Sequence, residues 1–363
     1  MLLDEGRIIR DIYEIERFLG EGAFAEVYRV KHKFLGRQAM KVFKSPSSSL
    51  EEIEQKLSEA VLLSRIGHPN IIRIFDADIV ETHVGQCGYF TMEYVAGGNV
   101  ETFWRSYQSN FVPISDAVEI VRQACTGLAV AHAEQPPIIH RDIKPQNILV
   151  GYDAVGLRSR VSDFGLAKKV NPLTLLASAR GTPAFKPPEF LSNVDSCAGD
   201  VWALGATLYL LLTDRLPFPI YDMMDLSSTK CWEHPLIPPS RFNLQVDPAL
   251  DSILFRALAL KPTDRYPDAR AMLADLMEWR LPEAGHFRKK RGNADGYKSA
   301  LGSSSQPDEA AEEEMVVKAL KLSQDTSRLM EAADLLEEAL NRCPRLRERY
   351  EYQLRLWRRG IVI

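Results

Sequence analysis

The residues with the clearest chemical potential lie in two short runs in the middle of the chain. The first run, His-Arg-Asp-Ile-Lys-Pro-Gln-Asn, contains Asp142, Lys144 and Asn147, and the second, Ser-Asp-Phe-Gly, contains Asp163. Asp142 is placed to accept a proton from an attacking hydroxyl group. Asn147 and Asp163 offer hard oxygen atoms that suit magnesium, which takes few protein ligands beside substrate phosphates. Lys144 adds a positive charge, so the set predicts phosphoryl transfer.

A second candidate site lies near the N-terminus, where Gly20 and Gly22 stand between two strand-like runs. Closely spaced glycines let the backbone approach an anion and direct N–H groups at phosphate oxygens, although a plain hairpin turn explains them equally well. Lys41 follows on a strand, and an interior lysine requires a phosphate or a carboxylate as its partner. Glu59, on an amphipathic helix, could be that carboxylate or an ordinary exposed glutamate.

The elements that must position these residues change character along the chain. Alternating apolar residues predict strands within 12–44, 71–77 and 89–94. Apolar residues spaced by three and four predict helices at 50–66, 114–133 and 200–212. A strand-rich lobe joined through Gly97 and Gly98 to a helix-rich lobe predicts a ligand cleft between the two.

These motifs, in this order, resemble those of the eukaryotic-type protein kinases. The early strands and the short chain resemble the bacterial, Hanks-type members of that family. The resemblance covers residues 12 to about 280 and implies an α+β, bilobal protein kinase fold with a β-rich N-lobe and a helical C-lobe. Further matching motifs support it: Gly181-Thr182-Pro183, Pro187-Pro188-Glu189 in place of Ala-Pro-Glu, Asp200-Val201-Trp202 and Arg265.

The resemblance implies a role for each site residue. Lys41 would hold the α- and β-phosphates of ATP and pair with Glu59, which stands nine residues before His68 as the family's helix glutamate does. Asp142 would be the catalytic base, and Asn147 and Asp163 would bind Mg²⁺, with Mn²⁺ as an alternative. The nucleotide would contact the glycine-rich loop, the adenine-sandwiching residues, the gatekeeper Met92 and the hinge residues: Leu19, Gly20, Gly22, Ala25, Val27, Ala39, Lys41, Met92, Glu93, Val95 and Leu149.

The resemblance also has departures and regulatory implications. Ala25 replaces the third glycine of the loop, and Pro187 beside Lys186 alters the segment that shapes the substrate groove. Glu189 and Arg265 are expected to form a buried structural ion pair. Arg141 marks kinases whose activation segment is ordered by a phosphate, with Ser178 as the expected carrier and Thr174 as the alternative. Ser178 could equally be a solvent-exposed loop serine.

Composition limits the remaining function classes. The 363 residues are 45% hydrophobic and 26% charged with a net charge of −4, which fits a globular protein and gives no reason to expect nucleic acid or membrane as partner. Five scattered cysteines and a start without a secretory signal predict a cytoplasmic protein.

The chain is expected to divide into three parts. A kinase domain spans 1–282, with an N-lobe at 12–96 and a C-lobe at 97–282, and a flexible linker spans 283–311. A helical tail at 312–363 resembles a tetratricopeptide repeat in part, with a generic helical bundle as the alternative. Its apolar stripe predicts docking on its own kinase domain, on a second copy or on a partner protein. Arg355, Arg358 and Arg359 are expected at the rim of that stripe.

Three functions compete for this sequence. The favoured one is a non-specific serine/threonine protein kinase that acts on protein substrates and autophosphorylates, because Lys144 and the Gly-Thr-Pro run are marks of that branch. A pseudokinase scaffold predicts the loss of Lys41, Asp142, Asn147 or Asp163, and each is present. A small-molecule phosphotransferase would lack the segment between Gly165 and Glu189.

Overall fold

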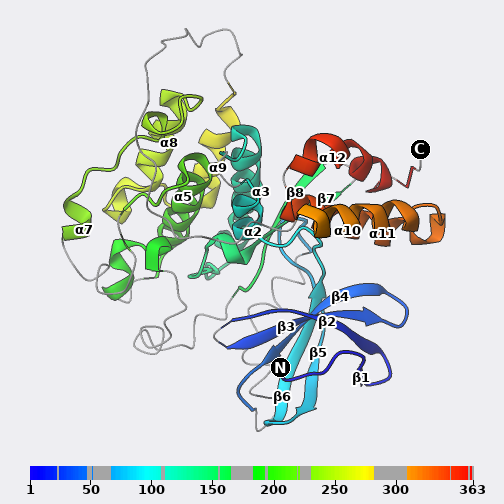
Figure 1. Ribbon diagram of the computed structural model, residues 1–363. Coiled ribbons are helices and arrows are strands. Elements are labelled where there is room, and N and C mark those ends of the chain that lie inside the picture. The colour runs from blue at the N-terminus through cyan, green and yellow to red at the C-terminus, as the bar shows by residue number, and fades with distance from the viewer. Residues whose placement is uncertain are drawn as a thin grey trace.

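The structure is a computed structural model in which two lobes are joined by a short connection, with a helical tail beside them (Figure 1). It describes residues 1–22, 24–46, 51, 67–107, 111–153, 156–164, 183–192, 195–218, 220, 230–281, 309–343, 345–358 and 360–361. Of the expected helix 50–66, only Glu51 belongs to these residues, and it is helical.

The N-lobe is a six-stranded sheet in the order β1-β2-β3-β4-β6-β5. Its strands are β1 Ile8–Ile9, β2 Tyr13–Glu21, β3 Ala25–His32, β4 Gly36–Phe43, β5 Ile74–Thr82 and β6 Gly85–Glu93. All neighbouring strands are antiparallel, and the alternation of the sequence places Tyr28, Met40 and Tyr89 in the core on one face. The predicted strand-rich lobe is therefore confirmed.

The C-lobe is built around two long helices, α3 Ile114–His132 and α5 Cys197–Thr213. Helix α5 is apolar on every side, and for that reason it lies in the middle of the lobe with nearly all of its residues buried. The other helices among the described residues of this lobe are α2 Val100–Arg105, α7 Lys230–Glu233, α8 Pro248–Ala257 and α9 Ala269–Glu278. Short 3₁₀ turns connect them: η1 Pro145–Asn147, η2 Pro183–Phe185, η3 Pro188–Ser192, η4 Pro239–Arg241 and η5 Pro262–Asp264.

A two-stranded hairpin between the lobes positions the two chemical motifs. Strand β7 Ile148–Asp153 pairs antiparallel with β8 Gly156–Val161, and Ile148 lies opposite Val161. Asn147 precedes the first strand and Ser162 follows the second, so both motifs emerge at the same end of the hairpin. Pairing of this hairpin therefore brings the run around Asp142 next to the run around Asp163.

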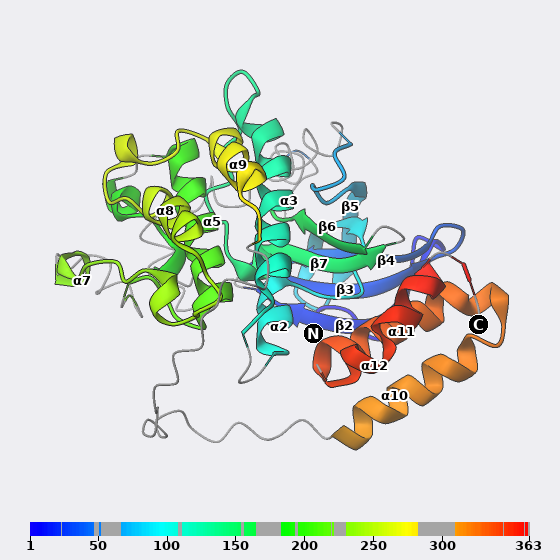
Figure 2. The same ribbon diagram turned by 90° about the horizontal axis from the view of Figure 1, so that it is seen from above.

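The tail forms three helices that lie beside the β7–β8 hairpin and the N-lobe sheet (Figures 1 and 2). They are α10 Glu309–Leu322, α11 Leu329–Arg342 and α12 Arg345–Arg358, with the turn η6 Thr326–Arg328 before α11. Helix α10 starts three residues before the predicted tail boundary at position 312. The tail contacts the kinase domain of its own chain, for example through the Arg17–Glu338 pair, whereas docking on a second copy or on a partner protein stays a prediction.

The apolar stripe of the tail has a different partner from the one expected. Leu336, Leu340, Leu354 and Trp357 are buried against other residues of the tail, and Tyr152 of β7 packs on this cluster from the kinase domain. Helix α10 supplies the cover that the sequence argument lacked, through Val316 and Ala319. Contacts with the lobes are instead mostly polar.

The expected arginine rim of the tail is also corrected in part. The Arg358 side chain is 8% exposed and lies inside the tail rather than at its rim. It is held there by ion pairs with Asp334 and Glu337. Arg355 is half exposed and pairs with Glu351 on its own helix, whereas Arg359 lies outside the described residues. Among the helices that the structure describes, none combines the length and the apolar character needed to cross a lipid bilayer.

Candidate active site

The backbone around Asp142 is held by one buried carboxylate. Asp200, in the first turn of α5, accepts hydrogen bonds from the backbone N–H groups of His140 (2.7 Å) and Arg141 (2.9 Å). Arg141 has a positive φ of 68°, a strained conformation that these bonds stabilise. Although burial opposes ionisation, hydrogen bonding to His132 lowers the pKa of Asp200, so the anchor is negatively charged. Sequence analysis assigned Asp200 to a motif but gave it no role.

His132 shares this anchor. Its Nε2 lies 3.1 Å from the Asp200 carboxylate, and both side chains are almost completely buried. Burial alone would lower the pKa of His132, but the hydrogen bond to Asp200 raises that pKa to about 9. The pair is therefore a buried ion pair at neutral pH, and it connects α3 to α5 beneath the catalytic residues.

The Asp142 carboxylate is surrounded by donors. Lys144 Nζ donates to Oδ2 at 2.7 Å, Asn147 Nδ2 donates to the same oxygen at 3.0 Å, and Lys186 Nζ donates to Oδ1 at 2.7 Å. Burial alone would raise the pKa of Asp142, but Lys186 and Lys144 lower it to about 2. The carboxylate is consequently ionised and oriented, as the acceptor of a hydroxyl proton must be.

Lys186 is the residue whose contact the sequence analysis missed. It was recognised only as a neighbour of Pro187 in the substrate groove, whereas its ammonium group also binds the Arg141 carbonyl oxygen at 3.0 Å. The Lys186 side chain is 10% exposed and lies over the Phe190 ring. A lysine buried beside an apolar Pro-Pro run requires an anion nearby, and this signal could have pointed to Asp142.

Asp163, two residues after the end of β8, forms an ion pair with Lys41 of β4. Lys41 Nζ lies 2.5 Å from Asp163 Oδ1, and Asp163 has a positive φ of 63°. The next residue, Phe164, is buried with its ring 4.5 Å from the ring of His140. His140 in turn lies 2.8 Å from the Ser162 carbonyl oxygen, so the two motifs contact each other directly. Glu59, the expected partner of Lys41, lies outside the described residues.

The donor chemistry suits a magnesium–nucleotide complex. Asn147 uses its amide nitrogen to bind Asp142 (2.7 Å to the carbonyl oxygen), which leaves the amide oxygen as an acceptor. Within the described residues, no group of three or more His, Cys, Asp or Glu side chains could hold a metal ion. The side-chain oxygens of Asn147 and Asp163 are of the kind that binds magnesium, which relies on substrate phosphates and water for most of its ligands.

Most of the predicted adenine-contacting residues gather in one apolar cluster. The cluster includes Ala25, Ala39, Met92, Val27, Val95 and Leu149. It combines residues of β3, β4 and β6 with Leu149 of β7 below, so it is contributed by both lobes. Leu19, on β2, is outside the cluster and is 38% exposed. Gly20 and Glu21 pair with Val27 and Glu26 in the turn that continues through Gly22.

The connection between the lobes offers backbone groups beside this cluster. The Glu93 N–H donates to the Arg73 carbonyl oxygen at 2.9 Å, and the Val95 carbonyl accepts from Gly98 at 3.2 Å. In the part of the chain that the structure describes, the Val95 N–H donates to no protein acceptor. The resemblance assigns the backbone of Glu93 and Val95 to adenine binding, and this N–H is one of the groups that could serve it.

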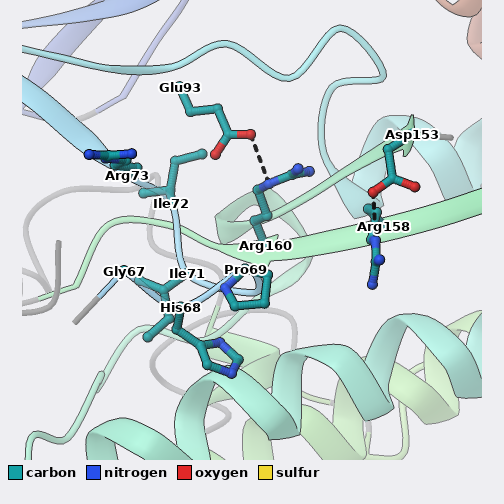
Figure 3. A pocket seen from close by; sticks show the side chains of 10 residues that line it. All are labelled: Gly67, His68, Pro69, Ile71, Ile72, Arg73, Glu93, Asp153, Arg158 and Arg160. Atoms are coloured by element: carbon teal, nitrogen blue, oxygen red, sulfur yellow. Dashed lines mark hydrogen bonds and ion pairs between the residues drawn. The ribbon is translucent and has the colours of Figure 1, made fainter. Parts of the chain in front are cut away.

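A cavity of about 250 Å³ lies beside Glu93 and borders this cluster, with which it shares Ile72 (Figure 3). Its lining includes Arg73, Glu93, Asp153, Arg158 and Arg160. Figure 3 shows Glu93 directed at Arg160, with 2.9 Å between the charged groups, and Asp153 directed at Arg158. Burial raises the pKa of Glu93, although Arg160 opposes the shift. Arg160 and Arg158 are thus each paired with a carboxylate, at separate ends of the cavity.

Two further expectations concern structure and regulation. Arg265 and Glu189 form the expected bidentate pair, with N–O distances of 2.7 and 2.8 Å and an Arg265 side chain that is fully buried. Arg141 Nε donates to Asp195 at 2.7 Å on the surface. Ser178 and Thr174 lie outside the described residues.

Comparisons with known proteins agree with this geometry. A model of the protein kinase domain matches residues 13–277. The serine/threonine-protein kinase PknB of Mycolicibacterium smegmatis is 33% identical over 289 residues, which cover 76% of this chain and 44% of the relative. PknB of Mycobacterium tuberculosis is 32% identical over 278 residues, or 74% of this chain and 43% of the relative. The chain therefore spans less than half the length of these relatives.

A solved structure gives the same result. The crystal structure of the PknI kinase domain of Mycobacterium tuberculosis, in a mutant form, superposes with a TM-score of 0.56 and 26% sequence identity. The match covers 77% of this chain and 99% of that kinase domain. Nearly the whole of that kinase domain therefore has a counterpart in this chain, and about a quarter of this chain has none in it.

Proposed function

The chain belongs to the protein kinase domain family, and from that membership we propose that it is a serine/threonine protein kinase using ATP and magnesium. One observation carries the proposal: Asp142 is ionised and oriented by Lys144 and Asn147, next to the Lys41–Asp163 pair. The names of its PknB relatives support serine and threonine hydroxyl groups of proteins as the acceptors.

In the proposed reaction, ATP supplies the γ-phosphoryl group. A metal ion bound with it would neutralise the charge of the phosphates. Asp142 orients the acceptor hydroxyl and takes its proton as the hydroxyl oxygen bonds to the γ-phosphorus. The bond from that phosphorus to the β–γ bridging oxygen breaks and ADP leaves with the bonding electrons, while Lys144 stabilises negative charge on the transferring group. Lys41 would turn from Asp163 toward the phosphates, and Asn147 and Asp163 would hold the metal ion through oxygen atoms. The cluster around Ala39, Met92 and Leu149 encloses the adenine ring.

We also propose a regulatory phosphate. Arg141 is paired with Asp195, whose side chain is 52% exposed, so the guanidinium group can exchange this partner for a more strongly charged one. A phosphate carries roughly −1.5 to −2 charge at neutral pH and binds arginine through several oxygens. Autophosphorylation on Ser178, or on Thr174, would supply it.

A cytoplasmic location fits the five free cysteines, which need a reducing compartment.

Incubation of the purified chain with radiolabelled ATP, magnesium and a generic protein substrate tests the activity. Label on serine or threonine that disappears with excess chelator is the expected result, and mass spectrometry then maps any autophosphorylation site. Label found only on small molecules would support a small-molecule phosphotransferase. Nucleotide binding without any transfer would support a pseudokinase.

A further inference from the structure

Helix α11 contacts the N-lobe through carboxylates. Glu338 Oε1 lies 3.0 Å from Arg17 of β2, and Arg37 of β4 lies 3.5 Å from Glu331 and 3.6 Å from Asp334. These residues of α11 are spaced by three and four, so they form one face of the helix. The side chains are only 12% to 35% exposed, and the pairs are therefore better shielded from solvent than ordinary surface ion pairs.

The same helix contacts the connection between the lobes. Asn341, three residues beyond Glu338 on this face, donates from Nδ2 to the Gly97 carbonyl oxygen at 2.8 Å. Gly97 has no space for a side chain, because a Cβ atom there would lie 2.2 Å from the Val150 carbonyl oxygen and 2.6 Å from Glu337 Oε1. Glycine at position 97 therefore lets the connection fit between β7 and α11.

The tail also contacts the hairpin below the connection. Glu337, with 1% of its side chain exposed, accepts a hydrogen bond from the Tyr152 N–H at 2.8 Å. Arg347 of α12 donates to the Tyr152 hydroxyl at 3.0 Å, and its guanidinium group lies 4.7 Å from the centre of the Phe103 ring of α2. These contacts attach the tail to the C-lobe side of the molecule.

Together, these contacts attach one helix to both lobes and to the connection between them. Helix α11 has 14 residues, so it is a rigid rod about 21 Å long at 1.5 Å per residue. Rotation of the N-lobe relative to the C-lobe would have to break the Arg17 and Arg37 pairs or pull Glu337 and Asn341 away from the hairpin and the connection.

We propose that the tail is an intramolecular brace that holds the two lobes at a fixed opening and thereby increases nucleotide affinity. The nucleotide cluster contains residues from both lobes, so its shape depends on how the lobes are oriented. When only a fraction of molecules has the competent orientation, the apparent Kd rises in inverse proportion to that fraction. The link to nucleotide rests on the proposed function, whereas the mechanical link between the lobes does not.

A charge swap in the full chain tests the brace. Arg17→Glu places two carboxylates together, Glu338→Arg places two guanidinium groups together, and the double variant restores an ion pair in reversed order. Each single variant should raise the Kd of a fluorescent ATP analogue with magnesium by about threefold or more, the scale of coupling between contacting charges. Each should also speed hydrogen exchange of the β7 amides, and the double variant should reverse both effects.

Arg256→Glu is the matched control. It breaks a surface pair at 3.5 Å between Arg256 of α8 and Asp275 of α9, and α8 lies on the side of the C-lobe away from the tail (Figure 1). It should leave the Kd and the exchange rate of β7 unchanged.

Other outcomes separate the parts of the proposal. Faster exchange at an unchanged Kd would show a docked tail without influence on nucleotide and would overturn the proposal, and so would unchanged exchange in both single variants. A parent chain without nucleotide affinity would contradict the proposed function. The brace would then be supported by exchange that rises in the single variants and recovers in the double variant, and overturned by exchange that does not.

Discussion

Asp142 in the catalytic loop and Glu337 in the tail are both shielded carboxylates, yet their surroundings shift their pKa values in opposite directions. Two ammonium groups and an amide lower the pKa of Asp142 to about 2. Burial raises the pKa of Glu337, and Arg358 with the Tyr152 N–H compensates only in part. The number of cationic donors therefore decides whether burial or charge determines the ionisation state.

The two carboxylates also differ in how far along the chain their partners lie. Lys144 and Asn147 follow Asp142 by two and five residues, and Lys186 is 44 residues away. Among the residues that the structure describes, Glu337 has no partner within five residues: Arg358 is 21 residues away and Tyr152 is 185 residues away. Local partners are specified by a short motif, but distant ones depend on how separate elements pack. We therefore expect the hydrogen bonds around Asp142 to survive loss of the tail contacts, and the tail contacts to survive loss of the catalytic residues.

The largest expected effect follows from substitution of the carboxylate in the catalytic loop. Asp142→Asn removes the proton acceptor while keeping its shape, so kcat should fall by ~10² to 10⁴, the scale of general acid–base groups. Steady-state phosphorylation with freshly purified protein measures this effect, and hydrogen exchange of β7 should match that of the parent. An unchanged kcat would remove Asp142 from the role of base.

The next effect distinguishes the two lysines at Asp142. Lys144→Met should lower kcat by ~10², the scale of one lost electrostatic stabiliser, because Lys144 is assigned to the phosphoryl group as well as to the base. Lys186→Met should lower it by less than about tenfold, because the Lys186 ammonium contacts the base and the Arg141 carbonyl. Equal losses in the two variants would show that Lys186 also acts on the transferring group.

A smaller effect tests the close packing behind the connection. Gly97→Ala places a methyl group against the backbone of Val150 and the side chain of Glu337, which should destabilise the fold by ~1 to 3 kcal/mol. Thermal unfolding should detect it as a lower Tm. Gly199→Ala is the control, because a Cβ there has its closest contact at 3.6 Å. A Gly97→Ala protein as stable as this control would show that the connection is not confined.

The smallest effect concerns the pH dependence of stability. Because the folded state raises the pKa of Glu337 above its ordinary value of 4.5, it binds that proton more tightly than the unfolded chain does. Its contribution to stability therefore falls as pH rises from about 4.5 through the raised pKa. Asp142 has the opposite sign, since its contribution is present above its ordinary pKa of 3.8 and is lost as pH falls toward about 2.

Glu337→Gln isolates the first of these contributions. The variant keeps an acceptor for the Tyr152 N–H but does not titrate, so the difference in unfolding free energy between parent and variant should decrease as pH rises. Denaturant unfolding between pH 4 and pH 8 measures this difference. A difference that is constant or increases with pH would contradict the raised pKa.

The sequence predicted the tail interface less well than the active site, and the reason is visible in α11. The apolar stripe that contains Leu336 and Leu340 predicted a docking surface, but this stripe packs within the tail. The face that contacts the lobes carries Glu331, Asp334, Glu338 and Asn341 at spacings of three and four. Acidic residues with this periodicity also occur on solvated helices, so the pattern alone does not indicate a contact. Likeness of the tail to a tetratricopeptide repeat stays a prediction, as do the domain boundaries.

The sequence by itself determined the strand-rich and helical lobes, the family and the chemical set of Lys41, Asp142, Asn147 and Asp163. Alternation, helical spacing and short motifs are local properties, and they are readable because each depends on neighbours a few residues away. Tertiary structure alone decided that Lys41 binds Asp163, that Lys186 reaches Asp142 and that the tail joins both lobes. Each of these contacts joins residues far apart in the chain, and their distances depend on the packing of whole elements rather than on local preference.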